Sequence, residues 1–352
     1  MQSCGLPAMY CKFSYYKIQQ MKRLGLLYAF GLVLFLWKTS PDACTRHSTL
    51  LCRVRDSLRS LWPGEREGPR KPCSCKTCIS QQNMSPWFDE RYSSTIEPLL
   101  TVKNQNIPAQ VQHWWLKLQR SNNGSHLQDI LARMFKVVSP MDESLERGNN
   151  GRCQRCAVVG NSGNLKGSKH GQLIDSHDFI LRMNGAKTVG FEEDVGSRTT
   201  HHFMYPESAV NLQPGIHLIL IPFKLLDLKW ITSALSTGEL RFTYMKVKSF
   251  IQADKDKVLI FNPSFFKYIH DNWTSHHGKY PSTGILALFF AIHVCDEVSV
   301  FGYGADSSGS WHHYWEKNRF ASAFRRTGVH NADFELALIK RLEQEGKVTF
   351  YT

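Results

Sequence analysis

A short apolar run that breaks at once into a glycine-rich loop constrains the fold of this chain more than any other feature. Residues 157–159, Ala-Val-Val, are followed directly by the loop GNSGN at 160–164. A buried parallel strand that ends in such a loop is a common place for α/β proteins to hold a nucleotide or a phosphate. The apolar segment 179–183 repeats the pattern and ends at Asn184. We therefore expect Asn161 and Asn184 at the same edge of a sheet.

Short apolar strands and helical patterns alternate from residue 156 to the C-terminus. This alternation predicts an α/β fold with a single doubly wound, mostly parallel sheet and helices on both faces. Residues 86–147 look helical, and the apolar side chains at 111, 114, 115 and 118 have the spacing of a buried helix face rather than of a sugar platform. The strands are expected at 157–159, 179–183, 200–204, 217–221, 258–261, 298–301 and 348–351, and the helices at 225–235, 263–273, 283–294 and 333–345.

The uncharged segment 24–37, LGLLYAFGLVLFLW, predicts an association with the membrane. Fourteen helical residues cover only about 21 Å of a hydrocarbon core of about 30 Å, so flanking Lys and Arg side chains would have to reach the interface. Basic residues upstream place the N-terminus in the cytoplasm. A cleaved signal peptide is the alternative, and a start at Met21 would also give a compact anchor. We expect a tail at 1–23, a signal anchor at 24–37, a stem at 38–72 and a luminal domain at 73–352.

The cysteines and the charge limit the compartment and the partners. Six of the ten cysteines are grouped, which fits either a zinc cluster or disulfides, and the luminal context favours disulfides. The sequons at Asn83, Asn123 and Asn272 agree with this compartment. The net charge of +13 is spread along the chain without a basic run among aromatics, which disfavours nucleic acid as a partner. An anionic small substrate or a membrane surface fits the charge equally well.

The loop at 160–164 does not have the spacing of a dinucleotide site. Ser162 and Leu165 stand where the fingerprint G-x-G-x-x-G requires its second and third glycines. A polar loop of this kind is better suited to one phosphate and a ribose than to a pyrophosphate. A strand-to-loop turn that binds no ligand is the alternative interpretation.

A second candidate phosphate site lies at Ser282, Thr283 and Gly284, directly before an apolar helix. Ser282 or Thr283 can cap the helix, and Gly284 lets a ligand approach the first turn. The free N–H groups and the positive end of the helix dipole attract an anion there. A helix cap without a ligand is the simpler interpretation.

Histidines near the C-terminus are candidates for catalysis. In WHHYW, at 311–315, no Glu or Asp stands at metal-ligand spacing on an evident helix, so a zinc site is disfavoured. His330 precedes a predicted helix with Asp333 and Glu335 close behind, and a loop histidine of this kind can act as a general base near neutral pH. A surface or capping histidine is the alternative.

The D-x-D pattern of Asp254 and Asp256 is found in many sugar-nucleotide transferases that hold Mn²⁺ or Mg²⁺. Here Lys255 and Lys257 interleave with the two carboxylates and would oppose a divalent cation. We therefore expect a solvated turn and no metal site.

Taken together, the blocks CAVVGNSGNL, DSHDFILRMN, GFEEDVGSRTTHH, YPSTGILALFFAIHVCDEVSVFGYGAD, HHYW and RTGVHNADFE resemble the motifs of the animal sialyltransferases, glycosyltransferase family 29, in order and spacing. The resemblance covers residues 73 to the C-terminus and implies a variant of the GT-A fold. The blocks CKTCI, WFDERY, HWWLKLQR and IPFKLLDLKW are most similar to the subgroup that sialylates the 3-position of galactose in Galβ1,3GalNAc.

The resemblance implies a role for individual residues. It implies that His330 is the catalytic base and that His313 contacts the departing phosphate, and that Cys73–Cys78, Cys75–Cys153 and Cys156–Cys295 are disulfides. No counterpart exists for the cysteines at 4, 11, 44 and 52. The substrate-binding residues that it implies are Gln119 for the acceptor and Asn161, Asn184, Tyr244, Tyr280, Ser282, Thr283, Gly284 and Gly304 around the nucleotide, its phosphate and the sugar.

The activity that the resemblance implies is an inverting transfer of N-acetylneuraminic acid from CMP-sialic acid to O3 of a terminal galactose on glycoproteins and glycolipids. It needs no metal and no cofactor beyond the donor substrate. It implies a single-pass type II protein of the Golgi membrane with a luminal catalytic domain, and a soluble form after cleavage in the stem. The competing hypothesis is a luminal carbohydrate-binding protein that has the same fold and no turnover.

Overall fold

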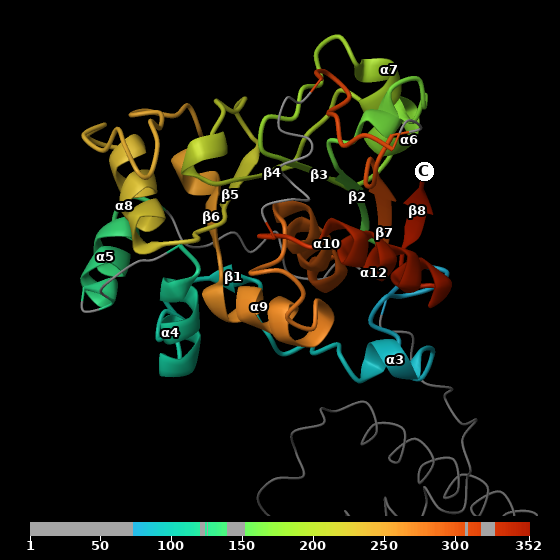
Figure 1. The fold of residues 1–352 in the computed structure, drawn as a ribbon, viewed down its shortest axis with the longest axis horizontal. Coiled ribbons are helices and arrows are strands. Elements are labelled where there is room, and N and C mark those ends of the chain that lie inside the picture. The colour runs from blue at the N-terminus through green and yellow to red at the C-terminus, as the bar shows by residue number, and fades with distance from the viewer. Residues whose placement is uncertain (1–72, 120–123, 125, 139–151, 307–308, 318–327) are drawn as a thin grey trace, which may run out of the picture. The chain divides into compact units, whose positions relative to one another are not determined.

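The computed structural model describes residues 73–119, 124, 126–138, 152–306, 309–317 and 328–352 (Figure 1). The predicted tail, anchor and stem and the sequon at Asn123 lie outside these residues. In the part of the chain that is described, no helix is both long enough and apolar enough to cross a membrane.

One eight-stranded sheet organises the domain, in the order β1-β6-β5-β4-β3-β2-β7-β8. Every neighbouring pair is parallel except β1 and β6, which are antiparallel. The prediction of an α/β fold with a mostly parallel sheet is therefore confirmed. The strands are β1 (Leu99–Leu100), β2 (Arg155–Val159), β3 (Phe179–Met183), β4 (His201–Met204), β5 (His217–Leu220), β6 (Val258–Phe261), β7 (Glu297–Phe301) and β8 (Thr349–Tyr351).

The strand order reverses at β2. From β2 the chain adds β3, β4, β5 and β6 on one side, and then returns to place β7 and β8 on the other (Figure 1). Parallel sheets bind ligands outside the carboxyl ends of the strands at such a switch point. The loops that follow β2 and β7 are therefore the expected walls of a ligand site.

Both faces of the central strands are buried. Cys156 and Val158 of β2 pack in one apolar cluster with the helix at 283–294, whereas Ala157 and Val159 pack in a second cluster with residues of the short helices at 171–175 and 192–195. Successive strand residues point to opposite faces, so the continuous apolar run at 157–159 reflects two covered faces.

The helices are α3 (Pro86–Asp89), α4 (Ala109–Lys117), α5 (Leu127–Met134), α6 (Gly171–Asp175), α7 (Glu192–Val195), α8 (Leu225–Ala234), α9 (Pro263–Tyr268), α10 (Thr283–Val294) and α12 (Ala332–Gln344).

The helical expectation for residues 86–147 holds only for α3, α4 and α5, and it is wrong for residues 90–108, which form turns, irregular segments and β1. Residues 120–123, 125 and 139–147 lie outside the described residues. Leu99 and Leu100 form β1, the edge strand that pairs with β6, rather than part of a helix. Pro98 favours an extended conformation in the residue before it, and its carbonyl accepts a hydrogen bond from the Asn262 amide at 2.9 Å. The predicted helix at 263–273 is also divided, because α9 passes into a π-helical turn at Ile269–Trp273. Val111, Trp115 and Leu118 are buried as expected.

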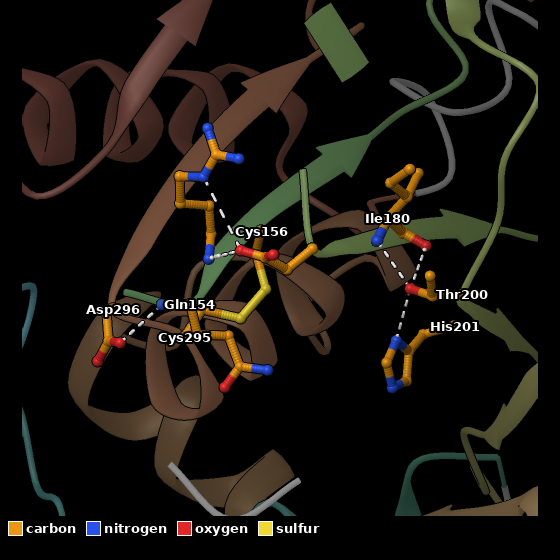
Figure 2. The surroundings of a disulfide bond; sticks show 9 residues. Gln154, Cys156, Ile180, Thr200, His201, Cys295 and Asp296 are labelled. Carbon is orange, nitrogen blue, oxygen red and sulfur yellow. Dashed lines mark hydrogen bonds and ion pairs between the residues drawn. A yellow bond between two sulfur atoms is a disulfide. The ribbon is translucent and has the colours of Figure 1, made fainter. Parts of the chain in front are cut away.

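Three disulfides hold the described domain together. They join Cys73 to Cys78, Cys75 to Cys153 and Cys156 to Cys295. Figure 2 shows Cys156, on β2, joined to Cys295, which ends α10. Beside it, the Gln154 amide donates to the Asp296 carboxylate at 2.9 Å. The link therefore joins the inner strand β2 to the helix that packs against the sheet.

Candidate active site

A cavity of about 370 Å³ opens at the switch point of the sheet. The loop after β2 and the loop after β7 both line it, together with the N-terminal end of α10. Every binding or catalytic residue that the motifs single out lies in its wall, although these residues are spread from position 119 to position 330. They are Gln119, Asn161, Asn184, Tyr244, Tyr280, Ser282, Thr283, Gly284, Gly304, His313 and His330.

The two asparagines meet at the edge of the sheet. The side-chain amide of Asn161 donates to the Met183 carbonyl at 3.1 Å, next to Asn184. Asn184 has a φ of 55°, in the left-handed region, and its carbonyl accepts a 2.7 Å hydrogen bond from His202. Burial lowers the pKa of His202 to about 4, so its ring is neutral and holds one proton for this bond.

The orientation of the Asn184 side chain follows from its neighbour. Ser208 donates its hydroxyl proton to Asn184 Oδ1 at 2.9 Å. The Tyr205 carbonyl, at 3.2 Å, is a second acceptor for the same Ser208 proton. When that proton goes to Asn184 Oδ1, the amide nitrogen of Asn184 is left to donate to a ligand. Asn184 is therefore oriented to bind an oxygen of an anionic or hydroxylated ligand.

Glycine allows two backbones to approach each other at the wall of the cavity. A Cβ atom at Gly160 would lie 2.2 Å from the Gly302 carbonyl oxygen, so no larger residue fits between the loops after β2 and β7. At Gly284 a Cβ atom would lie 2.9 Å from the Tyr303 ring. The hydroxyl of Tyr303 donates to the Gly284 carbonyl at 2.8 Å and fixes this turn.

The N-terminus of α10 is capped by Ser282, one of the two residues predicted for this role. Ser282 is the N-cap, and its Oγ accepts from the Ile285 amide at 3.3 Å. The Glu335 carboxylate, on α12, accepts from the backbone N–H of Ser282 at 2.8 Å and from its hydroxyl at 2.6 Å. Burial raises the pKa of Glu335 to about 7. Thr283 and Gly284 follow the cap, where helix N–H groups have no partner within the helix.

His330 has the geometry of a neutral base. Its Nδ1 donates to the Tyr280 carbonyl at 2.8 Å, since a carbonyl oxygen can only accept. In the neutral ring the lone pair is then on Nε2. Burial lowers the pKa of His330 below its ordinary value, which keeps the ring neutral in mildly acidic solution.

His313 lies in the same wall with a different partner. Its Nδ1 is 3.0 Å from Oε1 of Glu316, and its ring stacks on Trp315 with a centroid separation of 4.5 Å. The Glu316 carboxylate accepts a hydrogen bond from Nδ1 of His313. The two histidines are therefore held differently, His330 by a backbone carbonyl and His313 by a carboxylate.

Gln119 and Tyr280 meet at another part of the wall. The Gln119 amide nitrogen donates to the Tyr280 hydroxyl at 3.3 Å, and Tyr280 also supplies the carbonyl that holds His330. Tyr244 lines the same cavity while its ring is 60% exposed, so it stands at the mouth.

Sequence reasoning did not identify several residues of the wall. Tyr205 follows the carboxyl end of β4, so the rule that selected Asn161 and Asn184 could have found it. The sequence does not mark Glu335 except by its position near His330. Its hydrogen bonds to Ser282 form only because α12 lies beside the N-terminus of α10. The lining residues that no motif singled out also include Met183, Phe223, Tyr303, Trp311, His312, Ala332, Leu336 and Ile339.

The structure places the remaining predicted sites away from the cavity. Asp254 caps a short 3-10 turn at Lys255–Lys257 through a hydrogen bond to the Asp256 amide, and neither aspartate lines the cavity. Among the described residues, the groups with metal-ligand spacing contain Cys73, Cys75 or Cys153, all of which are in disulfides. Asn83 and Asn272 are exposed.

Comparisons with known proteins agree with the geometry. The family model for glycosyltransferase family 29 (sialyltransferase) matches residues 99–347. The chain is 57% identical over 279 residues to CMP-N-acetylneuraminate-beta-galactosamide-alpha-2,3-sialyltransferase 2 of Mus musculus, with 79% of each chain covered. It is 51% identical over 342 residues to CMP-N-acetylneuraminate-beta-galactosamide-alpha-2,3-sialyltransferase 1 of Mus musculus. This match covers 94% of this chain and 99% of the relative.

A solved structure extends the similarity to the fold. The crystal structure of a mammalian sialyltransferase in complex with Gal-beta-1-3GalNAc-ortho-nitrophenol has a TM-score of 0.75 and 48% sequence identity to this chain. The match covers 80% of this chain and 99% of that one.

Proposed function

Because the chain belongs to glycosyltransferase family 29, the sialyltransferases, we propose that it transfers N-acetylneuraminic acid from CMP-sialic acid to O3 of a terminal galactose in Galβ1,3GalNAc. The observation that carries the proposal is the single cavity in which a glycine-rich switch point, the end of α10 and two histidines meet. The acceptor follows from the relatives, which are beta-galactosamide alpha-2,3-sialyltransferases, and from the similar structure that holds Gal-beta-1-3GalNAc.

The donor takes the part of the cavity between Asn161, Asn184 and the N-terminus of α10. Asn184 presents an amide nitrogen there, and the first turn of α10 presents backbone N–H groups. These donors suit the phosphate and ribose of one nucleotide. As CMP departs, negative charge grows on its phosphate oxygen, and His313 with the helix N–H groups stabilises that charge.

The acceptor loses a proton as its hydroxyl attacks the anomeric carbon. We assign His330 as the base that takes this proton, because Nε2 carries the lone pair while the Tyr280 carbonyl holds Nδ1. Attack on the side opposite the departing phosphate inverts the configuration. The leaving group is a phosphate monoester, so the hydrogen-bond donors can stabilise it without a divalent cation.

The proposal is tested by incubating the full-length chain with CMP-sialic acid and a panel of galactosides. We expect transfer to Galβ1,3GalNAc, with a rate unchanged by EDTA, and product analysis should find a new linkage at galactose O3. If the chain binds galactosides but transfers nothing, it is a carbohydrate-binding protein on this fold. A strong requirement for Mn²⁺ would instead return attention to Asp254 and Asp256.

The pH dependence of transfer reports on His330. Its folded-state pKa is lowered by burial, so the neutral base survives below pH 6.5 and is lost only as the pH falls through that lower value. We expect the acidic limb of kcat/KM to have its midpoint below 6.5. Burial raises the pKa of Glu335 to about 7, so this carboxyl could also contribute to the pH profile. The profile is therefore repeated with Glu335→Gln, in which the acidic limb that belongs to His330 must remain. A midpoint at or above 6.5 in both proteins would contradict the assignment.

The topology and the modifications remain part of the proposal. We propose that the chain is a type II protein of the Golgi membrane, anchored through residues 24–37 with the catalytic domain in the lumen. The disulfides of the described domain and the exposed sequons at Asn83 and Asn272 support a luminal compartment.

A further inference from the structure

A buried charged cluster lies directly behind the Gln119 side of the cavity. Lys224 Nζ is 3.0 Å from Gln119 Oε1, 3.0 Å from Glu207 Oε1 and 2.8 Å from Asp227 Oδ1. The side chains of Lys224, Glu207 and Asp227 are 8%, 3% and 0% exposed. Lys224 Nζ donates hydrogen bonds to Gln119 Oε1 and Glu207 Oε1, which use two of its three protons, and it forms an ion pair with Asp227.

The cluster joins segments that are far apart in the sequence. Glu207 follows β4 and also accepts a hydrogen bond from the Thr243 hydroxyl. Asp227 lies in the first turn of α8, where it accepts from the backbone N–H groups of Phe223 and Lys224 at 2.8 and 3.2 Å. Gln119 is just beyond the end of α4. Lys224 is therefore held on one side by two carboxylates and reaches the cavity wall on the other.

The capping of α8 by Asp227 does not by itself explain why a lysine is buried at position 224. Asp227 satisfies the first turn of α8 through its bonds to backbone N–H groups, which need no ammonium. Buried ion clusters contribute little net stability because desolvation of the charges offsets their attraction. The cap leaves unexplained the contacts of Lys224 with Glu207, with the Tyr244 ring at 5.0 Å and with Gln119, 105 residues earlier in the chain.

That contact fixes which way the Gln119 amide faces. Lysine can only donate, so the atom of Gln119 that faces Lys224 must be the carbonyl oxygen. The amide nitrogen then faces the Tyr280 hydroxyl, at 3.3 Å, and keeps a second proton. Because the Tyr280 oxygen accepts from Gln119, its own proton is free to be donated. The wall at this point presents hydrogen-bond donors rather than acceptors.

We propose that Lys224 is a positioning residue for the acceptor sugar: by holding Gln119 Oε1, it directs the Gln119 amide and the Tyr280 hydroxyl to donate to galactose hydroxyl oxygens. The inference rests on the proposed function, in which this side of the cavity takes the acceptor. Without Lys224 the Gln119 amide can turn over, and its oxygen would then meet the Tyr280 hydroxyl. Because Tyr280 also holds His330, the same arrangement aligns the acceptor with the base.

The test compares Lys224→Met with wild type in the full-length chain. Methionine keeps the unbranched shape and removes the charge. We expect the KM for Galβ1,3GalNAc to rise about tenfold or more, with the KM for CMP-sialic acid unchanged and kcat within about threefold. An unchanged acceptor KM, or equal increases in both KM values, would overturn the proposal.

Lys347→Met is the matched control. Lys347 is also buried, and its Nζ donates to the carbonyls of Ile79 and Gln81 at 2.9 and 3.2 Å, but it does not line the cavity. Its loss is expected to lower Tm without changing the acceptor KM. If Lys347→Met raised the acceptor KM as much as Lys224→Met, a general loss of stability would explain both, and the proposal would fail.

A double-mutant cycle tests whether Lys224 acts through Gln119. In Gln119→Ala the amide is gone, so adding Lys224→Met should change the acceptor KM by less than about twofold. Additive effects would contradict the proposed route. Wild-type protein that transfers nothing to Galβ1,3GalNAc would instead refute the proposed function itself, so the two failures are distinguishable.

A second variant covers the case in which Lys224→Met does not fold. In Lys224→Met/Glu207→Gln one carboxylate charge is removed with the lysine, and Asp227 keeps its backbone bonds. Burial raises the pKa of Asp227 to about 7, so this carboxyl can accept a proton once the ammonium is absent. The same rise in acceptor KM is expected, and a wild-type KM in the folded double variant would overturn the proposal.

Discussion

Replacing His330 by alanine is expected to lower kcat for sialic acid transfer by about a thousandfold, the range in which general bases contribute. The variant loses the Nε2 lone pair that is assigned to take the proton of the attacking hydroxyl. Donor binding should persist, because the other contacts assigned to the nucleotide come from Asn161, Asn184 and the start of α10. Steady-state kinetics and calorimetric titration with CMP measure the two effects separately.

His330→Asn is the control for structural damage at this position. The asparagine amide nitrogen can replace Nδ1 and donate to the Tyr280 carbonyl, while nothing replaces the base at Nε2. Both variants should therefore lose transfer, and His330→Asn should keep the wild-type Tm more closely. His313→Ala should differ by weakening CMP binding as well as slowing transfer. Turnover near the wild-type rate in His330→Asn would rule out the base assignment.

Removal of the Cys156–Cys295 disulfide is expected to destabilise the domain by about 5 kcal/mol. The bond closes a loop with a sequence separation of 139 residues, and loop-closure entropy gives an effect of this size. It also joins β2, at the centre of the sheet, to the end of α10, which packs on that sheet. The measurement is denaturant unfolding of Cys156→Ala/Cys295→Ala under conditions that keep the other disulfides oxidised.

Cys73→Ala/Cys78→Ala provides the matched comparison. This disulfide has a sequence separation of only 5 residues, for which the same relation gives about 2 kcal/mol. The ratio of the two effects is more informative than either value, since both variants lose a buried or partly buried disulfide. Equal losses of stability would show that loop length does not control the effect and that local packing does.

The candidate site could largely be predicted from the sequence because each part has a local signature. Gly160 and Asn161 follow an apolar strand, Ser282 precedes an apolar helix, and His330 stands in a short motif that resembles a known family. Parallel strands place their carboxyl ends at one edge of a sheet. The meeting of such loops can therefore be predicted even when the strand order is unknown. The structure brings these residues into one cavity.

Local patterns failed where the chain was too short or too irregular to show a period. β1 consists of Leu99 and Leu100 alone, and two residues have no alternation to recognise. Its strand conformation depends on pairing with β6, which is far away in the sequence. The π-helical turn at Ile269–Trp273 likewise has the apolar spacing of the helix that precedes it.

The sequence by itself determined the class of fold, the strand ends that carry the site and the types of side chain available for catalysis. Only the tertiary structure decided the strand order, the binding of Ser282 by Glu335 and the direction of the Gln119 amide. The physical reason is that these features are pairwise contacts between distant segments. A periodic pattern reports which face of an element is buried, but a hydrogen bond such as that from Lys224 to Gln119 exists only once both elements are in place.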